Sequence, residues 1–427
     1  MKTITGCSGK SGVVSEGPHK AEELNLFFNQ FNSSSAISTP PLPPSGPSGC
    51  ASSSSSGSSP PVITAYQVWS ELCQLHPRKA AGPDGVCPRL LKACADELCE
   101  PLQHVFNLSL QLGRVPSLWK TSCIVPVPKK THPCELNDYR PVTLTSHAMK
   151  TLERLVMRHL RRQVQNVGDP LQFAYREKPS LLQEKLNIMA VDPHLVNWIM
   201  DYLTNRPQYV RVGGQMSSTL TCSTGAPQGT VLSPLLFTLY TSDYNSNTCH
   251  IQKFSNDTAI VTCIRDGEEE EYRSLVQKFE GWCQQNLLLL NISKTKEMVL
   301  DFRRAPPSSC PIIIQNAEVE VVSSYKYLGL QMDDKLNSSK NMECVYKKGQ
   351  SRMYFLRRLA SFKVCSVLLN MFYQSIVSSV LFYAVVCWGG SARKRDTQKL
   401  NRIIRRVGSV VGLGLDSVEK VVEQRTF

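Results

Sequence analysis

The sequence lacks the cysteine and histidine patterns that hold structural metals or form redox pairs. None of its 16 cysteines belongs to a C-x-x-C pair, and the two nearest, Cys94 and Cys99, are too far apart for one. No His-x-His or Cys/His knuckle accompanies them, which excludes a zinc finger or zinc ribbon. We therefore expect reduced intracellular thiols that serve mostly as small core residues.

Signals for secretion or membrane insertion are also scarce. Residues 1–14 lack the apolar core of a secretory signal, so we expect an intracellular protein of the nucleus or cytoplasm. Val364 to Trp388 has no charged residue and is long enough to be considered as a membrane span. Its polar residues fall four apart, at Ser366, Asn370, Gln374 and Ser378. This spacing predicts an amphipathic, mostly buried helix, and no membrane partner.

Acidic residues are few relative to basic ones. Forty-eight Lys and Arg stand against 35 Asp and Glu, which gives a net charge of +13. A polyanion is the natural partner, and nucleic acid is the first candidate, with an ordinary basic surface as the alternative. The 427 residues, 41% of them apolar, can bury a real core in one large domain or in two to three smaller ones.

The amino-terminal part has too few apolar residues to fold by itself. Asn32 to Pro61 is almost entirely Ser, Pro and Gly, and such a composition predicts a flexible linker. Glu22 to Phe31 offers only one short apolar helix face. We expect residues 1–61 to be disordered and the folded part to begin near Val62.

One stretch has the composition of a β-hairpin with a carboxylate at its tip. Ile251 to Val261 reads IQKFSNDTAIV, in which Ser255, Asn256 and Asp257 interrupt two apolar flanks. A carboxylate on a rigid hairpin can bind a divalent cation such as Mg²⁺ if a second carboxylate arrives from elsewhere. An ordinary Asx-turn is the alternative interpretation.

A second motif lies upstream, where Gly225 to Phe237 reads GAPQGTVLSPLLF. Together with the hairpin it resembles motifs B and C of the reverse transcriptases of non-LTR (LINE-type) retrotransposons, and these residues follow the family order without gaps: Gly225, Pro227, Gln228 and Gly229. The resemblance implies an α+β right-hand polymerase of fingers, palm and thumb. It also implies RNA-templated DNA synthesis with two Mg²⁺ ions.

Two departures from the family put that activity in doubt. The family hairpin carries F-x-D-D, whereas Asn256 replaces the first aspartate here and only Asp257 remains as a catalytic and metal-binding carboxylate. Motif A, which delivers the second carboxylate on a buried strand, has no room, because Gln172 to Lys178 is followed directly by Pro179 to Leu186. A strand and its crossover need about a dozen residues or more. The palm sheet is therefore expected to be incomplete.

No nearby aspartate replaces the missing one in the sequence. Asp192 precedes Pro193 and reads as a helix N-cap, and Asp201 lies inside the helix that follows, so both are expected to be structural. We predict a reverse transcriptase remnant with little or no polymerase activity. The alternative is a non-catalytic nucleic-acid-binding or helical scaffold protein.

Several cations are candidates for binding template or nucleotide. Trp119 to Lys130 and Leu136 to Leu144 read as a hairpin, which places Lys129, Lys130 and Arg140 at adjacent ends. The resemblance implies that Gln228 lies beside the nascent base pair and Lys294 near an incoming triphosphate. The expected partners are an RNA template and DNA primer, or an RNA–DNA duplex, with deoxynucleotides if the chain is active.

The resemblance divides the chain into fingers-like residues 62–178, palm-like residues 179–335 with motifs B, C and D, and thumb-like helices with a basic tail in 336–427.

Pro88 to Leu112 should be helical with a break at Pro101, and Ser146 to Val164 should form a helix. Its arginines should face outward: Arg154, Arg158, Arg161 and Arg162. Leu287 to Phe302 resembles motif D, a turn and a strand. Ala317 to Val322 and Tyr325 to Met332 read as a further hairpin, and Arg393 to Arg406 as a basic stretch that binds nucleic acid or is solvated.

Overall fold

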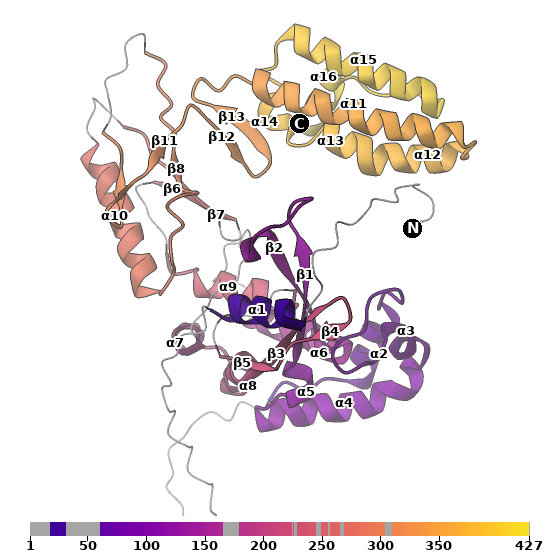
Figure 1. Cartoon of the computed structure of the whole chain (residues 1–427), viewed down its shortest axis with the longest axis vertical. Coiled ribbons are helices and arrows are strands. Elements are labelled where there is room, and N and C mark those ends of the chain that lie inside the picture. Colours follow the sequence, from indigo (N-terminus) through magenta and orange to yellow (C-terminus); the bar gives the residue numbers. More distant parts are fainter. Residues whose placement is uncertain are drawn as a thin grey trace, which may run out of the picture. The chain divides into compact units, whose positions relative to one another are not determined.

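The computed structural model describes residues 18–30, 60–164, 179–223, 225, 229–244, 249–254, 257–264, 269–303 and 310–426 (Figure 1). Nearly all of the predicted linker, the segment 172–178, and the residues Pro227, Gln228 and Asn256 lie outside this part. The chain divides into two compact units. Unit 1 comprises residues 1–263 and 285–288, and unit 2 comprises residues 264–284 and 289–427. Both contain helices and strands, in agreement with the predicted α+β class.

Unit 1 contains a five-stranded sheet. Its strands are β1 (Ser122–Pro128), β2 (Tyr139–Leu144), β3 (Arg206–Val212), β4 (Gln215–Met216) and β5 (Leu220–Cys222). β1 pairs antiparallel with β2 and parallel with β3, and β3 also pairs with β4 and β5. The predicted hairpin is therefore confirmed, with Val127 opposite Arg140. A short 3₁₀ turn, Leu136–Asp138, precedes β2.

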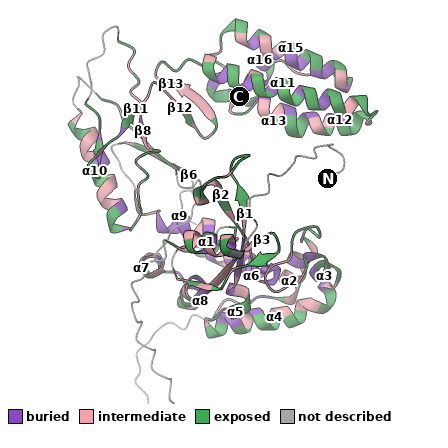
Figure 2. Cartoon of the chain, in the orientation of Figure 1, coloured by how far each residue is buried: buried purple, intermediate pink, exposed green. Residues whose placement is uncertain are grey.

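Nine helices surround this sheet in the described part of unit 1. They are α1 (Pro18–Asn29), α2 (Ala65–Cys73), α3 (Pro88–Ala93), α4 (Ala95–Leu112), α5 (Ser117–Lys120), α6 (His147–Gln163), α7 (Pro179–Ile188), α8 (Pro193–Leu203) and α9 (Ser233–Tyr240). Large side chains such as Phe106, Met149 and Trp198 are fully buried, and Figure 2 shows that these helices carry both buried and exposed positions. The helix starts follow their local signals: Thr64 forms a capping box with Gln67.

Two expectations for unit 1 need correction. α1 lies before the predicted start near Val62, yet its Leu24 is buried with Ile124 and Val210 of the sheet. Pro101 lies within α4 and does not break it; the interruption falls at Cys94, where α3 ends. Burial of Phe106 and Leu110 further along α4 outweighs the local cost of proline.

The cysteines are less buried than expected. Of the described thiols, all free, only Cys123 and Cys283 are buried, and seven are exposed. The expectation of core thiols is therefore wrong for most of them, because nothing in a lone cysteine's local sequence specifies the face on which it lies.

The residues at the shortened join form a helix. α7 packs Leu182 and Leu186, both fully buried, into the core with α8 and α9. Lys185 fixes this helix by binding Tyr240 O at 2.5 Å, Asn286 Oδ1 at 2.6 Å and Asp243 Oδ1 at 2.9 Å. Residues 179–205 contain no strand. The chain thus passes from the join to β3 through α7 and α8.

The predicted motif C hairpin is present as β6 (His250–Phe254) and β7 (Asp257–Val261). The strands pair antiparallel, with Phe254 opposite Asp257, and no third strand pairs with them among the residues that the structure describes. Phe254 and Val261 are exposed. Lys253 docks the hairpin onto α9, because its buried Nζ donates to Thr241 O at 2.7 Å.

Unit 2 begins with a helix and short strands and ends in a helical bundle. Its elements are α10 (Glu270–Gln285), β8 (Lys296–Glu297), β9 (Ile313–Ile314), β10 (Ala317–Glu318), β11 (Glu320–Val321), β12 (Ser324–Tyr327), β13 (Leu330–Asp333), α11 (Ser339–Ser361), α12 (Ser366–Phe372), a π-helical turn (Tyr373–Ser378), α13 (Ser379–Leu381), α14 (Val385–Trp388), α15 (Lys394–Val411) and α16 (Val418–Thr426). The bundle has its own core, which includes Leu356, Val377 and Leu400.

Strand pairing in unit 2 differs from the prediction. β11 pairs in parallel with β8, and β10 pairs with β9, so residues 317–322 do not pair with 325–332. Instead β12 pairs with β13 around Leu328 and Gly329, which both have positive φ as a tight two-residue hairpin turn requires. The predicted motif D strand shrinks to the two residues of β8.

The sequence predicted one mostly buried helix for the uncharged stretch Val364 to Trp388, and this prediction is wrong. Ser366–Trp388 is the one described stretch long and apolar enough to cross a membrane, and 33% of its most apolar window is buried. Its polar residues Asn370, Gln374 and Ser378 line a hollow of about 340 Å³ beside residues 413–416. Apolar residues of the stretch are exposed as well, at Val367, Leu368 and Met371. The basic stretch that follows is helix α15, with Leu400 and Ile403 buried, and is not a solvated tail.

Candidate functional site

The hairpin presents a single carboxylate in the described part of the chain. Asp257 is the first residue of β7 and is exposed. No group of three or more His, Cys, Asp or Glu able to hold a metal ion occurs among the described residues. A two-metal site needs several hard oxygen ligands with negative charge. The described side chains around the hairpin therefore do not fit a pair of Mg²⁺ ions.

The two aspartates that follow the join have structural roles, as predicted. Asp192 caps α8, because its Oδ1 accepts from His194 N at 2.8 Å and from Leu195 N at 3.4 Å. Asp201 accepts from Val115 N at 2.7 Å and forms an ion pair with Lys120 at 2.7 Å. The oxygens of Asp192 and Asp201 bind backbone N–H groups and the Lys120 side chain. Neither carboxylate therefore replaces the missing motif A aspartate as a metal ligand.

The motif B loop packs its backbone close to the end of β2. Gly225 and Gly229 have φ of 63° and 91°, a left-handed conformation that glycine adopts at no steric cost. A Cβ on Gly229 would lie 3.3 Å from Thr143 O. Any larger residue at position 229 would therefore combine backbone strain with a tight contact. α9 begins at Ser233, in agreement with the prediction of a helix there.

A buried carboxylate from α6 holds the start of α9. Glu153 is completely buried, and its Oε2 accepts from Val231 N at 2.5 Å and from Leu232 N at 3.0 Å. Val231 and Leu232 directly precede α9, where N–H groups have no partner within the helix. A carboxylate is electrostatically favoured at such a helix start. Burial nevertheless outweighs these bonds and raises the pKa of Glu153 to about 7. No sequence motif marks Glu153 as a functional or structural residue. Its one signal in the sequence is its place beside Leu152, on the apolar side of an amphipathic helix.

The glycine-rich loop of residues 78–85 approaches the same end of β2. A Cβ on Gly82 would lie 2.6 Å from Thr145 O, so only glycine fits without movement. His147 Nε2 is 2.9 Å from Ala80 O, and burial lowers the pKa of His147, so the neutral ring donates this hydrogen bond. The 78–85 loop, the β2–α6 junction and the motif B loop therefore meet at one place.

The predicted fingers-like cations lie at the hairpin ends but two of them bind their own loop. Lys129 Nζ donates to Asn137 O at 2.5 Å, and Lys130 Nζ pairs with Asp138 Oδ2 at 2.9 Å. The pKa of Asp138 is lowered to about 2. The largest cause is the hydrogen bond from the N–H of Glu135, followed by those from Lys130 and from the N–H of Cys134. Arg140 is exposed and has no ion pair among the described residues. Of the three, Arg140 is the side chain most available to a phosphate.

The predicted basic face of α6 is only partly free. Arg154 and Arg158 both pair with Glu71, which is 2% exposed. A carboxylate that is nearly removed from water needs such partners, because an unpaired buried charge is costly. The prediction that these arginines face outward is confirmed for Arg158, Arg161 and Arg162, which are exposed, whereas Arg154 is only partly exposed.

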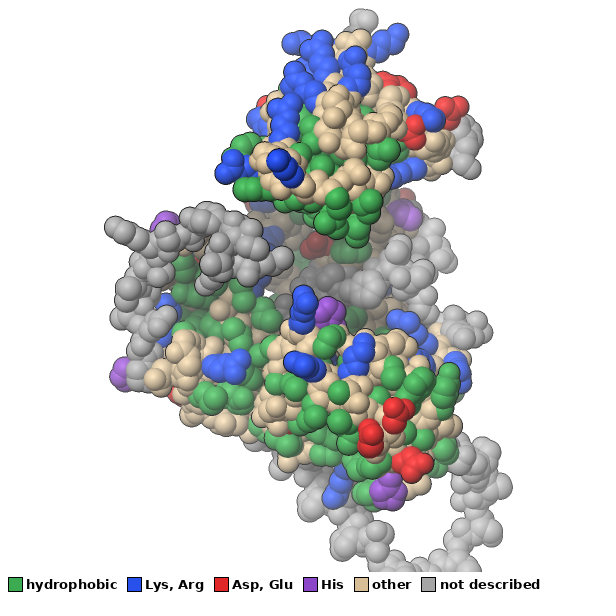
Figure 3. Space-filling view, turned by 90° about the vertical axis from the view of Figure 1, so that its right-hand side faces the viewer, with side chains coloured by type: hydrophobic (Ala, Val, Ile, Leu, Met, Phe, Trp, Pro, Cys, Tyr) green, Lys and Arg blue, Asp and Glu red, His purple; other side chains and the backbone are tan. Residues whose placement is uncertain are grey.

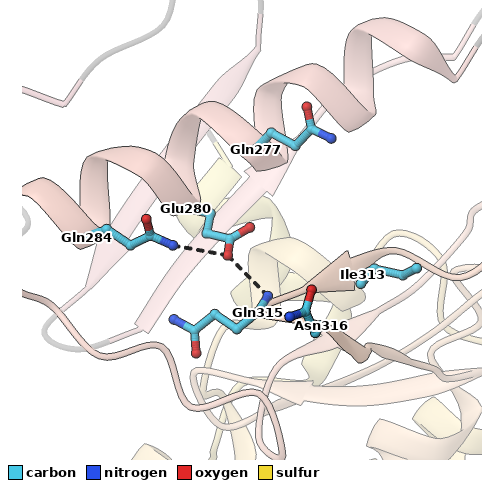
Figure 4. A pocket seen from close by; sticks show the side chains of 6 residues that line it. All are labelled: Gln277, Glu280, Gln284, Ile313, Gln315 and Asn316. Atoms are coloured by element: carbon cyan, nitrogen blue, oxygen red, sulfur yellow. Dashed lines mark hydrogen bonds between the residues drawn. The ribbon is translucent and has the colours of Figure 1, made fainter.

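Unit 2 contains a polar hollow of about 490 Å³ beside α10. Figure 4 shows its lining side chains, which come from α10 and from the β9–β10 turn: Gln277, Glu280, Gln284, Ile313, Gln315 and Asn316. Glu280 Oε1 accepts from Gln315 N at 3.1 Å and from Gln284 Nε2 at 3.3 Å, so it stabilises the turn. The lining has no cation and thus does not suit a phosphate. Lys294 is exposed in another turn, where its N donates to Asn291 Oδ1.

A glycine loop that leads into a buried helix, followed by a hairpin with a carboxylate at its tip, is the arrangement of motifs B and C in reverse transcriptases. Comparison with known proteins agrees: residues 182–332 match the family model described as reverse transcriptase (RNA-dependent DNA polymerase). Residues 182–332 are thus similar to a reverse transcriptase domain, which is consistent with the predicted resemblance to LINE-type elements. Residues 338–379 also match a model described as the N-terminal region of alkylated DNA repair protein alkB homolog 8.

Curated relatives come from mobile elements of Drosophila. The chain is 25% identical over 398 residues to the RNA-directed DNA polymerase from mobile element jockey of Drosophila melanogaster, covering 80% of this chain and 42% of that protein. It is 24% identical over 373 residues to the probable RNA-directed DNA polymerase from transposon BS of the same species, covering 74% and 41%. The chain therefore spans about two fifths of the length of these relatives, and the predicted resemblance is confirmed.

Proposed function

We propose that this chain is a reverse transcriptase remnant that binds nucleic acid and does not polymerise. The observation that carries the proposal is the hairpin β6–β7, which presents one carboxylate, Asp257, and pairs with no third strand among the described residues. In this proposal, residues 62–178, 179–335 and 336–427 correspond to fingers, palm and thumb of a right-hand polymerase whose palm sheet is incomplete.

Loss of polymerisation follows from the charge required at a two-metal centre. The family implies Mg²⁺, which prefers charged oxygen ligands in near-octahedral geometry. An amide at Asn256 is neutral, and the helix α7 follows the join where motif A would supply a strand with a second carboxylate. A single carboxylate cannot clamp both the attacking and the leaving oxygen through two ions.

Nucleic-acid binding needs no such centre. The net charge of +13 favours a phosphate backbone, and the exposed Arg140 and Lys294 are available to it. With Gly225, Pro227, Gln228 and Gly229 of motif B, these residues would contact an RNA template and DNA primer, or their duplex. The proposed site of action is the nucleus or cytoplasm, where such nucleic acids occur.

Primer extension by the full chain tests the proposal. An RNA template with an annealed DNA primer, deoxynucleotides and Mg²⁺ or Mn²⁺ should yield no extended product. The same preparation should bind the RNA–DNA duplex with an affinity that falls steeply as salt rises. Extension that disappears in Asp257→Ala would refute the lack of activity, and binding without salt dependence would refute the nucleic-acid partner.

A further inference from the structure

The C-terminal end of α11 exposes three aromatic rings. Tyr354, Phe355 and Phe362 are 65%, 48% and 64% exposed. The rings of Tyr354 and Phe355 lie 5.6 Å apart, and the guanidinium of Arg358 lies 5.1 Å from the centre of the Phe362 ring. Exposed aromatic residues gathered in this way are a feature of binding surfaces, because leaving them in water is unfavourable.

These side chains form a continuous strip. Phe355, Arg358 and Phe362 are spaced by three and four residues and so lie on one face of the helix, and Tyr354 extends this face through its ring contact. With a rise of about 1.5 Å per residue, the strip is roughly 12 Å long. We call Tyr354, Phe355, Arg358 and Phe362 the aromatic strip. Its length suits a few stacked bases.

The sequence segment that contains the aromatic strip carries basic charge and no acidic charge. Residues 344–395 contain nine Lys and Arg and no Asp or Glu. Of these nine, only Lys347 has an ion pair among the described residues, with Glu343. α15 adds the exposed Arg402, Arg405 and Arg406. Figure 3 shows a band of basic side chains on the helical bundle next to exposed hydrophobic ones. Such a field attracts a polyanion and repels other cations.

The backbone where α11 ends is also unusual. Lys363 has φ of 54°, a left-handed conformation that costs a residue with a side chain about 1 kcal/mol or more. Its N–H donates to Ala360 O at 3.0 Å, so the turn holds this conformation directly after Phe362.

We propose that the aromatic strip binds single-stranded nucleic acid. Unpaired bases stack on the rings of Tyr354, Phe355 and Phe362, while Arg357 and Lys363, both exposed, contact phosphates. Duplex offers its bases to the strip less well, because they are already stacked on one another. The inference goes beyond the proposed function, since it assigns single-strand binding to side chains at the end of α11 that the proposed function does not use.

The exposed apolar residues of the neighbouring helix α12 would also suit a lipid surface or a protein groove. The composition of the aromatic strip favours nucleic acid over both. Val367, Leu368 and Met371 are exposed and could enter an anionic lipid surface or a protein groove. The planar guanidinium of Arg358 lies over the ring of Phe362, and such a stack presents a flat polar and aromatic surface that matches a base. Nine cations without an acidic residue match a phosphate chain.

Fluorescence anisotropy with the full chain tests this proposal. The probes are short labelled oligo(U) and oligo(dT), with a blunt DNA duplex of equal length for comparison. Tyr354→Ala combined with Phe362→Ala should weaken single-strand binding by about tenfold or more, since each stacked base contributes substantially. Arg358→Gln should weaken it less, and Tyr66→Ala, which removes an equally exposed tyrosine of unit 1, should leave it unchanged.

Two further measurements can overturn the proposal. Phe362→Leu keeps an apolar side chain but removes the ring, so it should lose affinity as Phe362→Ala does; full retention would mean apolar docking and contradict stacking. Vesicles of phosphatidylserine should not compete with the oligonucleotides. Binding to vesicles that falls in the ring variants, with oligonucleotide binding intact, would assign the strip to lipid. If the full chain binds the single-stranded oligonucleotides but not the duplex, that result would contradict duplex binding in the proposed function. It would still support single-strand binding by the aromatic strip.

Discussion

The two hairpins of unit 1 carry similar sequence signals but differ in what surrounds them. β1 and β2 belong to a five-stranded sheet, and β1 buries Cys123 and Ile124. β6 and β7 pair only with each other among the described residues, and both of their ends are exposed. A two-stranded hairpin by itself is marginal in water, so tertiary support decides its rigidity. In this chain the hairpin without a third strand among the described residues is the one that bears Asp257.

The largest effect is expected from the supported hairpin. Ile124→Ala removes a side chain packed against Leu24 and Val210 and should lower the free energy of unfolding of unit 1 by roughly 2–5 kcal/mol. The matched variant Ile260→Ala in β7 should cost well under half as much, because that residue is only partly buried. Urea unfolding followed by circular dichroism measures both, and equal losses would erase the contrast between the hairpins.

Glu153 should make the stability of unit 1 depend on pH. Burial raises its pKa from 4.5 in the unfolded chain to about 7, so the folded state binds more protons between these values. Stability should therefore fall as pH rises through that window, by up to roughly 3 kcal/mol, and then level off. Glu153→Gln, which keeps an acceptor for Val231 N and Leu232 N, should remove this slope. An unchanged slope in urea unfolding across pH 4.5 to 7 would show that another group is responsible.

Lys363 allows a smaller test in unit 2. Lys363→Gly should raise the free energy of unfolding by about 1 kcal/mol, because glycine adopts the left-handed conformation without strain. Lys340→Gly, at an exposed position inside α11, should lower it by about the same amount. Thermal unfolding distinguishes the two, and destabilisation by both variants would mean that the turn at Lys363 is unstrained.

The smallest effect is expected at the family's metal position. Asn256→Asp restores the two adjacent aspartates of the hairpin but supplies no strand from motif A. Primer extension with Mg²⁺ should remain undetectable, because the second source of carboxylate is still missing. Appearance of extended product in this variant would show that the hairpin alone was the defect.

Local signals gave much of the fold, and long-range contacts did not follow from them. Asp192 caps its helix as predicted, and the two strands of the predicted hairpin β1–β2 pair with each other. The parallel pairing of β11 with β8 was missed, because nothing near either strand specifies a partner more than twenty residues away. The clamp by Glu153 was missed for the same reason.

The candidate site was predictable where a motif is contiguous. Gly225 and Gly229 adopt the conformations that only glycine tolerates well, so the motif itself encodes the loop. The partners of the charged side chains could not be predicted, since ion pairs such as Arg154 with Glu71 depend on which helices meet. The aromatic strip could not be foreseen either, because a tyrosine or phenylalanine at helical spacing more often belongs to a core.

Hydrogen–deuterium exchange compares the two hairpins most directly. Backbone amides of β1, flanked by β2 and β3, should be protected to nearly the global stability of unit 1. Amides of β6 and β7 should exchange much faster, because each strand has one open edge among the described residues and little buried surface. Protection of residues 250–261 equal to that of 122–128 would contradict the account, since it would mean that a third strand covers the hairpin.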